Sequence, residues 1–159
     1  MSEVWQARAD QAAEVTRLLI AFRDWLGEER PDNGAFAASV AQLLADPATE
    51  FLLGGVGAGT AACGVCQLRF RHSVWTSAPD CWLEDLYVEA DARGRGLGRA
   101  LVELAFERAG ARGARRIELD TNEDNGAAIA LYESLGFSAS SKAHGELRGR
   151  DVFMGRPLP

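Results

Sequence analysis

Leu83-Glu84-Asp85-Leu86-Tyr87-Val88, followed shortly by Arg93-Gly94-Arg95-Gly96-Leu97-Gly98, is the stretch that decides the fold of this chain. Apart from its two carboxylates, the first segment is apolar or aromatic, as expected for a central strand buried on both faces. The second segment is rich in glycine, and residues 99–112 after it carry apolar side chains at helical spacing. The sequence therefore predicts a strand, a glycine-rich loop and a helix, in that order.

The glycine-rich loop has the composition of an anion-binding site. Glycines allow positive φ angles and let a ligand approach the backbone closely, and a helix N-terminus presents free N–H groups. Arg93, Arg95 and Arg99 add positive charge. Taken alone, the stretch could equally be a loop that only turns the chain. Two known phosphate-binding motifs are excluded, because a P-loop needs Gly-Lys-Ser/Thr and the dinucleotide fingerprint needs a third glycine where Arg99 stands.

Elements on both sides of this stretch complete a layered sheet. Strands are expected at 4–7, 51–53, 63–71, 81–88 and 116–120, with short terminal strands around Ser138 and over 151–155. Helices are expected at 10–25 with Asp10 as N-cap, at 35–44, at 99–112, and at 125–135 with Gly136 as the C-terminal cap. This mixture predicts an α/β (α+β layered) fold in which helices flank one sheet.

Length and composition fit one domain over residues 1–159. Hydrophobic residues make up 47% and charged residues 25%, the usual balance of a globular chain with its own core. The net charge of −6 argues against nucleic acid or an anionic membrane as a partner. The apolar stretches are too short to span a bilayer, and residues 1–6 lack the features of a secretory signal.

Three cysteines, Cys63, Cys66 and Cys81, point to reduced thiols and a cytoplasmic setting. The spacing Cys63-Gly-Val-Cys66 matches C-x-x-C, but residues three apart on a strand point to opposite faces. No second pair or histidine cluster completes a metal site, so we expect structural thiols and no metal. The two histidines, His72 and His144, are expected at the surface or in loops.

Two motifs in order carry a family resemblance. Arg93, Gly96 and Gly98 spell R-x-x-G-x-G, and residues 125–137 spell N-x-x-A-x-x-L-Y-x-x-x-G-F. In these segments, about a third of its length, the chain resembles the GNAT N-acetyltransferase superfamily. The resemblance implies a mixed, mostly antiparallel twisted sheet of six to seven strands with flanking helices. It also implies acetyl-coenzyme A (acetyl-CoA) as co-substrate and, because dimers are common among similar proteins, a homodimer.

The resemblance also assigns cofactor contacts. The amides of residues 93–99 would hold the diphosphate, and the pantetheine arm would pair like an extra strand along residues 86–88, where the N–H of Val88 would polarise the thioester carbonyl. Asn125 can cap its helix by itself, and similarity adds a contact with coenzyme A. The cofactor-binding residues expected in this way are Leu86, Tyr87, Val88, Arg93, Gly94, Arg95, Gly96, Leu97, Gly98, Arg99, Asn125 and Tyr132.

The adjacent carboxylates Glu84 and Asp85 are unusual in an otherwise apolar strand, because ionised carboxylates there are costly unless they are paired or face a cleft. A salt bridge to an arginine is one interpretation. A general base is the other, since burial raises a carboxyl pKa toward the operating pH. Leu83-Glu84-Asp85 is similar to the polyamine acetyltransferase branch, in which the glutamate at this place is the base; Trp75 also has a counterpart there.

From spacing alone Tyr132 is a core residue, but the family pattern gives it the role of general acid toward the leaving sulfur.

The expected reaction is direct acetyl transfer in a ternary complex to a primary amine of a small molecule, with a polyamine as the first guess. Glu84 would take the proton, directly or through water, and Asp85 would attract the cation. Segments 28–33, 75–80 and 140–148 would shape the acceptor site. A non-catalytic acyl-CoA sensor, an enzyme acting on a protein or peptide amine, and a structural domain are the alternatives.

Overall fold

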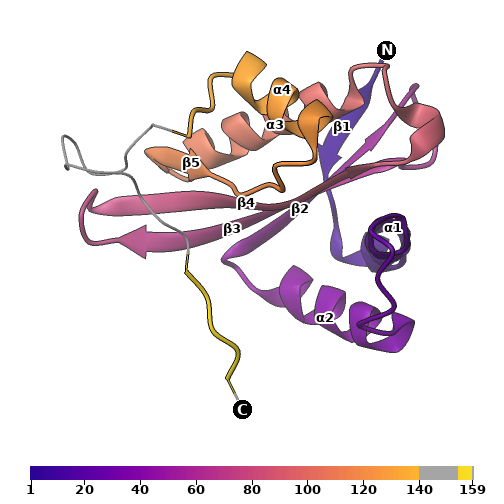
Figure 1. Ribbon diagram of the computed structural model, residues 1–159, viewed down its shortest axis with the longest axis horizontal. Helices are drawn as coiled ribbons and strands as arrows, with labels where there is room; N and C mark the ends of the chain where they lie inside the picture. Colours follow the sequence, from indigo (N-terminus) through magenta and orange to yellow (C-terminus); the bar gives the residue numbers. More distant parts are fainter. Residues whose placement is uncertain (140–153, 159) are drawn as a thin grey trace. The chain divides into compact units, whose positions relative to one another are not determined.

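The computed structural model describes residues 1–139 and 154–158 (Figure 1). Contacts divide the chain into two compact units, Met1–Asp120 and Thr121–Pro159. The first unit contains the sheet with helices α1, α2 and α3, and the second contains α4. That residues 1–159 form a single domain stays a prediction.

The sheet of the first unit is mixed and mostly antiparallel, as predicted. Its strands are β1 (Glu3–Gln6), β2 (Thr49–Gly55), β3 (Gly64–Ser73), β4 (Ala78–Val88) and β5 (Arg116–Glu118), in the spatial order β1-β2-β3-β4-β5. The first three pairs are antiparallel and β4 pairs with β5 in parallel. The described residues thus form five strands, fewer than the six to seven predicted. Of the two predicted terminal strands, the one around Ser138 is irregular in the structure, and residues 151–153 of the other lie outside the described residues. His144 lies outside the described residues as well.

The helices are α1 (Ala12–Trp25), α2 (Asn33–Ala45), α3 (Leu97–Ala111) and α4 (Gly126–Ser134). The prediction of Asp10 as the cap of the first helix is wrong. Gln11 is the N-cap of α1 after a 3-10 turn, and the Asp10 carboxylate instead pairs with Arg8 at 3.1 Å. Helix α2 has the usual kind of cap, since the Asp32 carboxylate accepts a 2.8 Å hydrogen bond from the Ala35 amide.

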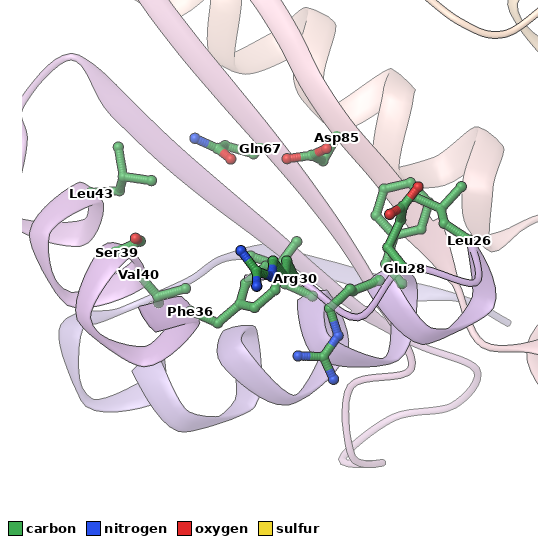
Figure 2. A pocket seen from close by; sticks show the side chains of 12 residues that line it. Leu26, Glu28, Arg30, Phe36, Ser39, Val40, Leu43, Gln67 and Asp85 are labelled. Carbon is green, nitrogen blue, oxygen red and sulfur yellow. The ribbon is translucent and has the colours of Figure 1, made fainter. Parts of the chain in front are cut away.

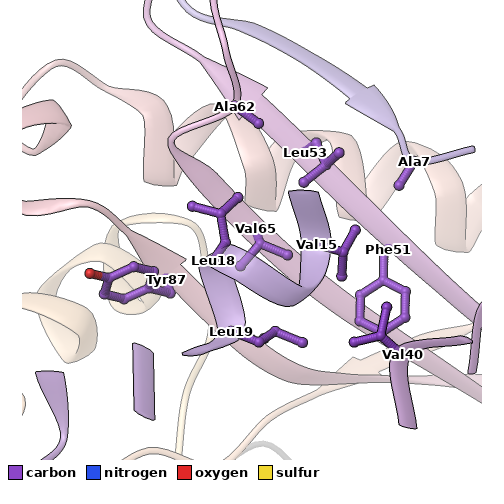
Figure 3. Packing of buried hydrophobic residues seen from close by; sticks show 10 residues of the cluster. All are labelled: Ala7, Val15, Leu18, Leu19, Val40, Phe51, Leu53, Ala62, Val65 and Tyr87. Atoms are coloured by element: carbon purple, nitrogen blue, oxygen red, sulfur yellow. The ribbon is translucent and has the colours of Figure 1, made fainter. Parts of the chain in front are cut away.

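Helices α1 and α2 cover one face of the sheet. Figure 3 shows Val15, Leu18 and Leu19 of α1 packed against side chains of the strands beneath them. Alternate residues of β2 point to this face. The buried cluster consists of Ala7, Val15, Leu18, Leu19, Val40, Phe51, Leu53, Ala62, Val65 and Tyr87.

Helix α3 covers the opposite face, and two glycines set how closely it packs. Gly54 of β2 and Gly64 of β3 are cross-strand partners. A Cβ on Gly54 would lie 2.6 Å from Leu97 Cδ1, and one on Gly64 would lie 3.0 Å from Leu101 Cδ1. A side chain at either position would displace these leucines, so the two glycines let the first turn of α3 lie directly on the sheet.

A buried ion-pair cluster fixes the other end of α3. Glu50 of β2 is 3% exposed and accepts hydrogen bonds from Arg108 at 2.8 and 2.9 Å and from Arg112 at 2.7 Å. Burial alone would raise the pKa of Glu50, but the bonds from the two arginines outweigh burial and the pKa is lowered. Helix α3 is therefore held at both ends, which fixes its N-terminus relative to the end of β4.

Candidate active site

The N-terminus of α3 is the first component of the site. Gly94 and Gly96 have φ angles of +73° and +81°, a region that favours glycine. Gly96 is the N-cap and has no side chain with which to cap the helix. In an α-helix the first amides have no intrahelical acceptor, so those of Leu97 and Gly98 at the start of α3 suit an anion. That residues 93–99 hold the diphosphate of a cofactor stays a prediction.

The arginines of the loop have different partners. Arg93 donates from Nε to the carbonyl oxygen of Val88 at 2.8 Å, and its guanidinium lies 4.9 Å from the ring centroid of Trp25 and 5.7 Å from that of Tyr87. Arg99 pairs with Glu103 at 3.8 Å. Arg93 is thus tied to the end of β4 and to the aromatic C-terminus of α1, an arrangement that the motif alone did not indicate.

One edge of β4 continues beyond its partner strand. Strand β5 pairs with β4 only over Asp80–Trp82, so from Leu83 to Val88 this edge has no β5 partner. Such an edge offers backbone donors and acceptors to an added strand. It includes residues 86–88, the predicted contact of the pantetheine arm.

A β-bulge separates the two carboxylates of β4. Gln67 of β3 pairs with Asp85, but the next residue, Leu68, pairs with Leu83, so Glu84 is the extra residue. Glu84 is exposed, whereas Asp85 is partly buried. Burial, followed by the charges of Glu84 and Asp120, raises the pKa of Asp85 from 3.8 to about 6. The resemblance placed the base at Glu84, but Glu84 is exposed, and the raised pKa belongs to Asp85. Which of the two carboxylates acts as the base stays a prediction.

A pocket of about 240 Å³ lies between α1, α2 and the sheet (Figure 2). Asp85 and Gln67 lie side by side on the sheet, with residues of α2 across from them. The loop between the helices adds Glu28 and Arg30, so the predicted segment 28–33 does contribute to a pocket. Trp75, by contrast, is 81% exposed near the turn between β3 and β4 and is not among the lining residues.

Arg23 supports the pocket from the side of α1. Its Nη1 donates to the carbonyl oxygen of Pro31 at 2.8 Å and to Oδ1 of Asn33 at 2.9 Å, and its guanidinium lies 5.6 Å from the Phe36 ring centroid. Arg23 thereby holds the loop between α1 and α2 in place. Sequence reasoning missed this residue because its partners become neighbours only when the two helices pack.

The second unit contains the other predicted residues. The side chain of Asn125 accepts a 3.2 Å hydrogen bond from the Ala128 amide, which confirms its role as N-cap of α4. Gly136 ends this helix with a φ of +91°. The ring of Tyr132 packs edge-on against Phe137 with 5.6 Å between centroids. That Asn125 and Tyr132 meet the loop of the first unit stays a prediction.

Within residues 1–139 and 154–158, no cluster of three or more His, Cys, Asp or Glu side chains could hold a metal ion. Nor is any helix in this part of the chain long and apolar enough to cross a membrane. Cys66 and Cys81 are buried and burial raises the pKa of both thiols, which fits structural cysteines.

Comparison with known proteins identifies the family. Residues 12–137 match the model of the "Acetyltransferase (GNAT) family". This match covers most of the chain and includes α1, the loop at 93–98 and α4. The chain belongs to the GNAT acetyltransferase family, as the two motifs indicated.

Individual relatives agree with this assignment. The thialysine N-epsilon-acetyltransferase of Sus scrofa is 30% identical over 114 residues, 72% of this chain and 62% of that protein. A putative acetyltransferase from Arthrobacter sp. FB24 has the same fold, with a TM-score of 0.83, 27% identity, and coverage of 98% of this chain and 96% of that one.

A third similar protein was solved with its cofactor. It is an aminoglycoside N-acetyltransferase in complex with coenzyme A, with a TM-score of 0.76, 19% identity, and coverage of 99% of this chain and 96% of that one. The chain spans less than two thirds of the length of the first curated relatives it matches, between 23% and 62%.

Proposed function

We propose that this chain transfers the acetyl group of acetyl-CoA to the primary amine of a small molecule, directly and within a ternary complex. The observation that carries the proposal is the N-terminus of α3, where Gly94 and Gly96 at positive φ expose the first amides of the helix. This anion site lies at the end of the β4 edge that β5 leaves without a partner. Membership in the GNAT family supports the same function.

The donor half of the reaction would use backbone groups. The amides of Leu97, Gly98 and Arg99 would bind the diphosphate, since a helix N-terminus attracts negative charge. Residues 86–88 would pair with the pantetheine arm, and the Val88 N–H would polarise the thioester carbonyl. When bound, acetyl-CoA supplies an acyl group attached to a thiolate that leaves readily. Asn125 would add a further contact with coenzyme A.

The acceptor half would remove a proton from the amine. An alkyl ammonium has a pKa of about 10 and becomes a nucleophile only when it loses that proton. Glu84, directly or through water, and Asp85 are the two candidates for the base, and only Asp85 lines the pocket. A C–N bond then forms and the C–S bond breaks, with Tyr132 giving its proton to the sulfur.

A polyamine is the acceptor class that the local resemblance favours, and a homodimer is the assembly it implies. The three cysteines favour a cytoplasmic setting. All three stay proposals. A thermal-shift titration with acetyl-CoA, followed by assay of thiol release across amines and peptide N-termini, tests the function. Stabilisation together with amine-dependent thiol release supports it. Stabilisation without release with any acceptor favours a sensor, and no stabilisation contradicts cofactor binding altogether.

A further inference from the structure

The walls of the pocket at Asp85 are mainly apolar. Six apolar side chains from α1, its C-cap and α2 line it: Leu19, Phe22, Leu26, Phe36, Val40 and Leu43. Leu26 is 55% exposed at the C-terminal end of α1, so the apolar lining extends to the surface. Phe22 also stacks on Tyr87 with 5.3 Å between centroids, which fixes this wall against β4.

The charged residues that line the pocket are two carboxylates, Asp85 and Glu28, and two guanidinium groups, Arg23 and Arg30. Arg23 is already paired with Asp24 at 2.7 Å, and the charges of Glu84 and Asp120 also act on Asp85. Most of the lining is apolar carbon, and a second ammonium group would meet it over much of the pocket.

The placement of Asp85 suits a single amine. It lies on the sheet beside Gln67, which is 4% exposed, and the α2 residues of the opposite wall are apolar, apart from Ser39. An apolar environment disfavours the charged form of an amine as well as that of a carboxyl. One ammonium group can give its proton to Asp85. A second one would have Glu28 of the interhelical loop as its one carboxylate among the lining residues and would otherwise be desolvated against apolar side chains.

From these observations, and resting on the proposed function, we propose that the acceptor is a monoamine with a compact apolar body and not a polycation. Its nitrogen would lie at Asp85 and its alkyl or aryl body against α1 and α2. A volume of about 240 Å³ fits a body of this kind. This inference departs from the polyamine that the local resemblance favours.

A matched pair of amines tests the inference on the intact chain. n-Pentylamine and 1,4-diaminobutane have the same number of non-hydrogen atoms and differ by a terminal methyl group in place of an ammonium group. We expect kcat/KM to be at least about tenfold higher for n-pentylamine. From propylamine to pentylamine, kcat/KM should rise about fourfold per methylene, which corresponds to ~0.8 kcal/mol for each buried CH₂. A higher value for the diamine, or no dependence on alkyl length, overturns the inference.

A pair of variants on α2 connects this selectivity to the pocket. Ser39 is exposed and lines the pocket, and Ala38 is exposed on the same helix without lining it. Ser39→Glu adds a carboxylate at the pocket and should reduce the preference for the monoamine about tenfold. Ala38→Glu makes the same change in charge and should leave the preference as it was. Equal effects of the two variants, or no effect of Ser39→Glu, overturn the assignment to this pocket.

The outcomes also separate this inference from the proposed function. Thiol release that is faster with 1,4-diaminobutane or an aminoglycoside than with n-pentylamine overturns the inference and leaves the acetyltransferase function standing. Stabilisation by acetyl-CoA without thiol release with n-pentylamine also overturns it. If acetyl-CoA neither stabilises the chain nor releases thiol with any amine, both fail.

Discussion

The loop at residues 93–98 with the first turn of α3, which we call the donor region, and the pocket around Asp85, which we call the acceptor region, are built from different parts of the chain. The donor region consists of backbone amides exposed by two glycines at positive φ. The acceptor region consists of side chains from α1, α2 and two strands. A site made of backbone groups works only in one local conformation. A site made of side chains depends on packing, so single substitutions can change its shape and charge in small steps.

The largest effect is expected from breaking the donor region. Gly96→Val places a branched side chain at a φ of +81°, which costs ~1–2 kcal/mol and shifts the loop. Loss of two charge-assisted hydrogen bonds, each worth about 1.5–3 kcal/mol, should weaken acetyl-CoA binding at least about 100-fold by calorimetry. Gly113→Val is the matched control, because Gly113 has a φ of +74° just past the other end of α3. Equal loss of binding in the control would mean that the fold, and not the anion site, had failed.

The next largest effect is expected in the acceptor region. Asp85→Asn removes the carboxylate that lines the pocket and should lower kcat/KM about 100-fold or more, the usual contribution of a general base. The profile of kcat/KM against pH in the unmodified chain should rise through about pH 6, as Asp85 loses its proton, and this rise should disappear in the variant.

Glu84→Gln is the comparison for Asp85→Asn, because the two carboxylates are adjacent and only one of them lines the pocket. If Asp85 is the base, the Glu84→Gln profile keeps a rise, at a lower pH than in the unmodified chain because the charge of Glu84 no longer raises the pKa of Asp85. A profile abolished by Glu84→Gln and retained by Asp85→Asn would assign the base to the bulged residue.

Replacing Tyr132 tests whether a residue of the second unit takes part in the reaction, by giving a proton to the sulfur that leaves the donor. Tyr132→Phe keeps the ring that packs on Phe137 and removes only the hydroxyl group. We expect kcat to fall about tenfold to 100-fold, at or below the low end for a general acid because a thiolate leaves readily. The affinity for acetyl-CoA should not change. Unchanged turnover would remove Tyr132 from the reaction.

The difference between the regions also explains what the sequence could predict. The glycines and arginines of residues 93–98 are consecutive, and Asn125 caps a helix that begins one residue later, so local rules suffice for both. The pocket joins Phe22, Phe36 and Asp85, which are neighbours only after α1 and α2 pack on the sheet. Which of Glu84 and Asp85 lines it depends on a bulge opposite Gln67, and no local pattern indicates that bulge.

Arg93 connects the two regions, and its replacement should have a smaller effect. Its hydrogen bond to the Val88 carbonyl and its contact with Trp25 join the end of β4 to the C-terminus of α1, beside the pocket. Arg93→Gln should raise the KM for the amine about two- to fivefold, since an exposed cation–π contact contributes about 0.5–1 kcal/mol. Arg95→Gln, in the same loop, should instead weaken acetyl-CoA binding. If both variants weaken only acetyl-CoA binding, Arg93 belongs to the donor region alone.

The smallest effect concerns stability and comes from the raised pKa of Asp85. The unfolded chain has a carboxyl pKa of 3.8 at this position and the folded chain about 6. Between these values the folded state binds more protons, so stability contributed by the neutral carboxyl is present below about pH 4 and is lost as the pH rises through 6. Asp85→Asn removes this loss, and its Tm should exceed that of the unmodified chain by a few degrees at pH 7 but not at pH 4. A variant less stable at pH 7 would show that the ionised carboxylate has a stabilising partner, and the acceptor region would then hold a structural ion pair like the one at Glu50.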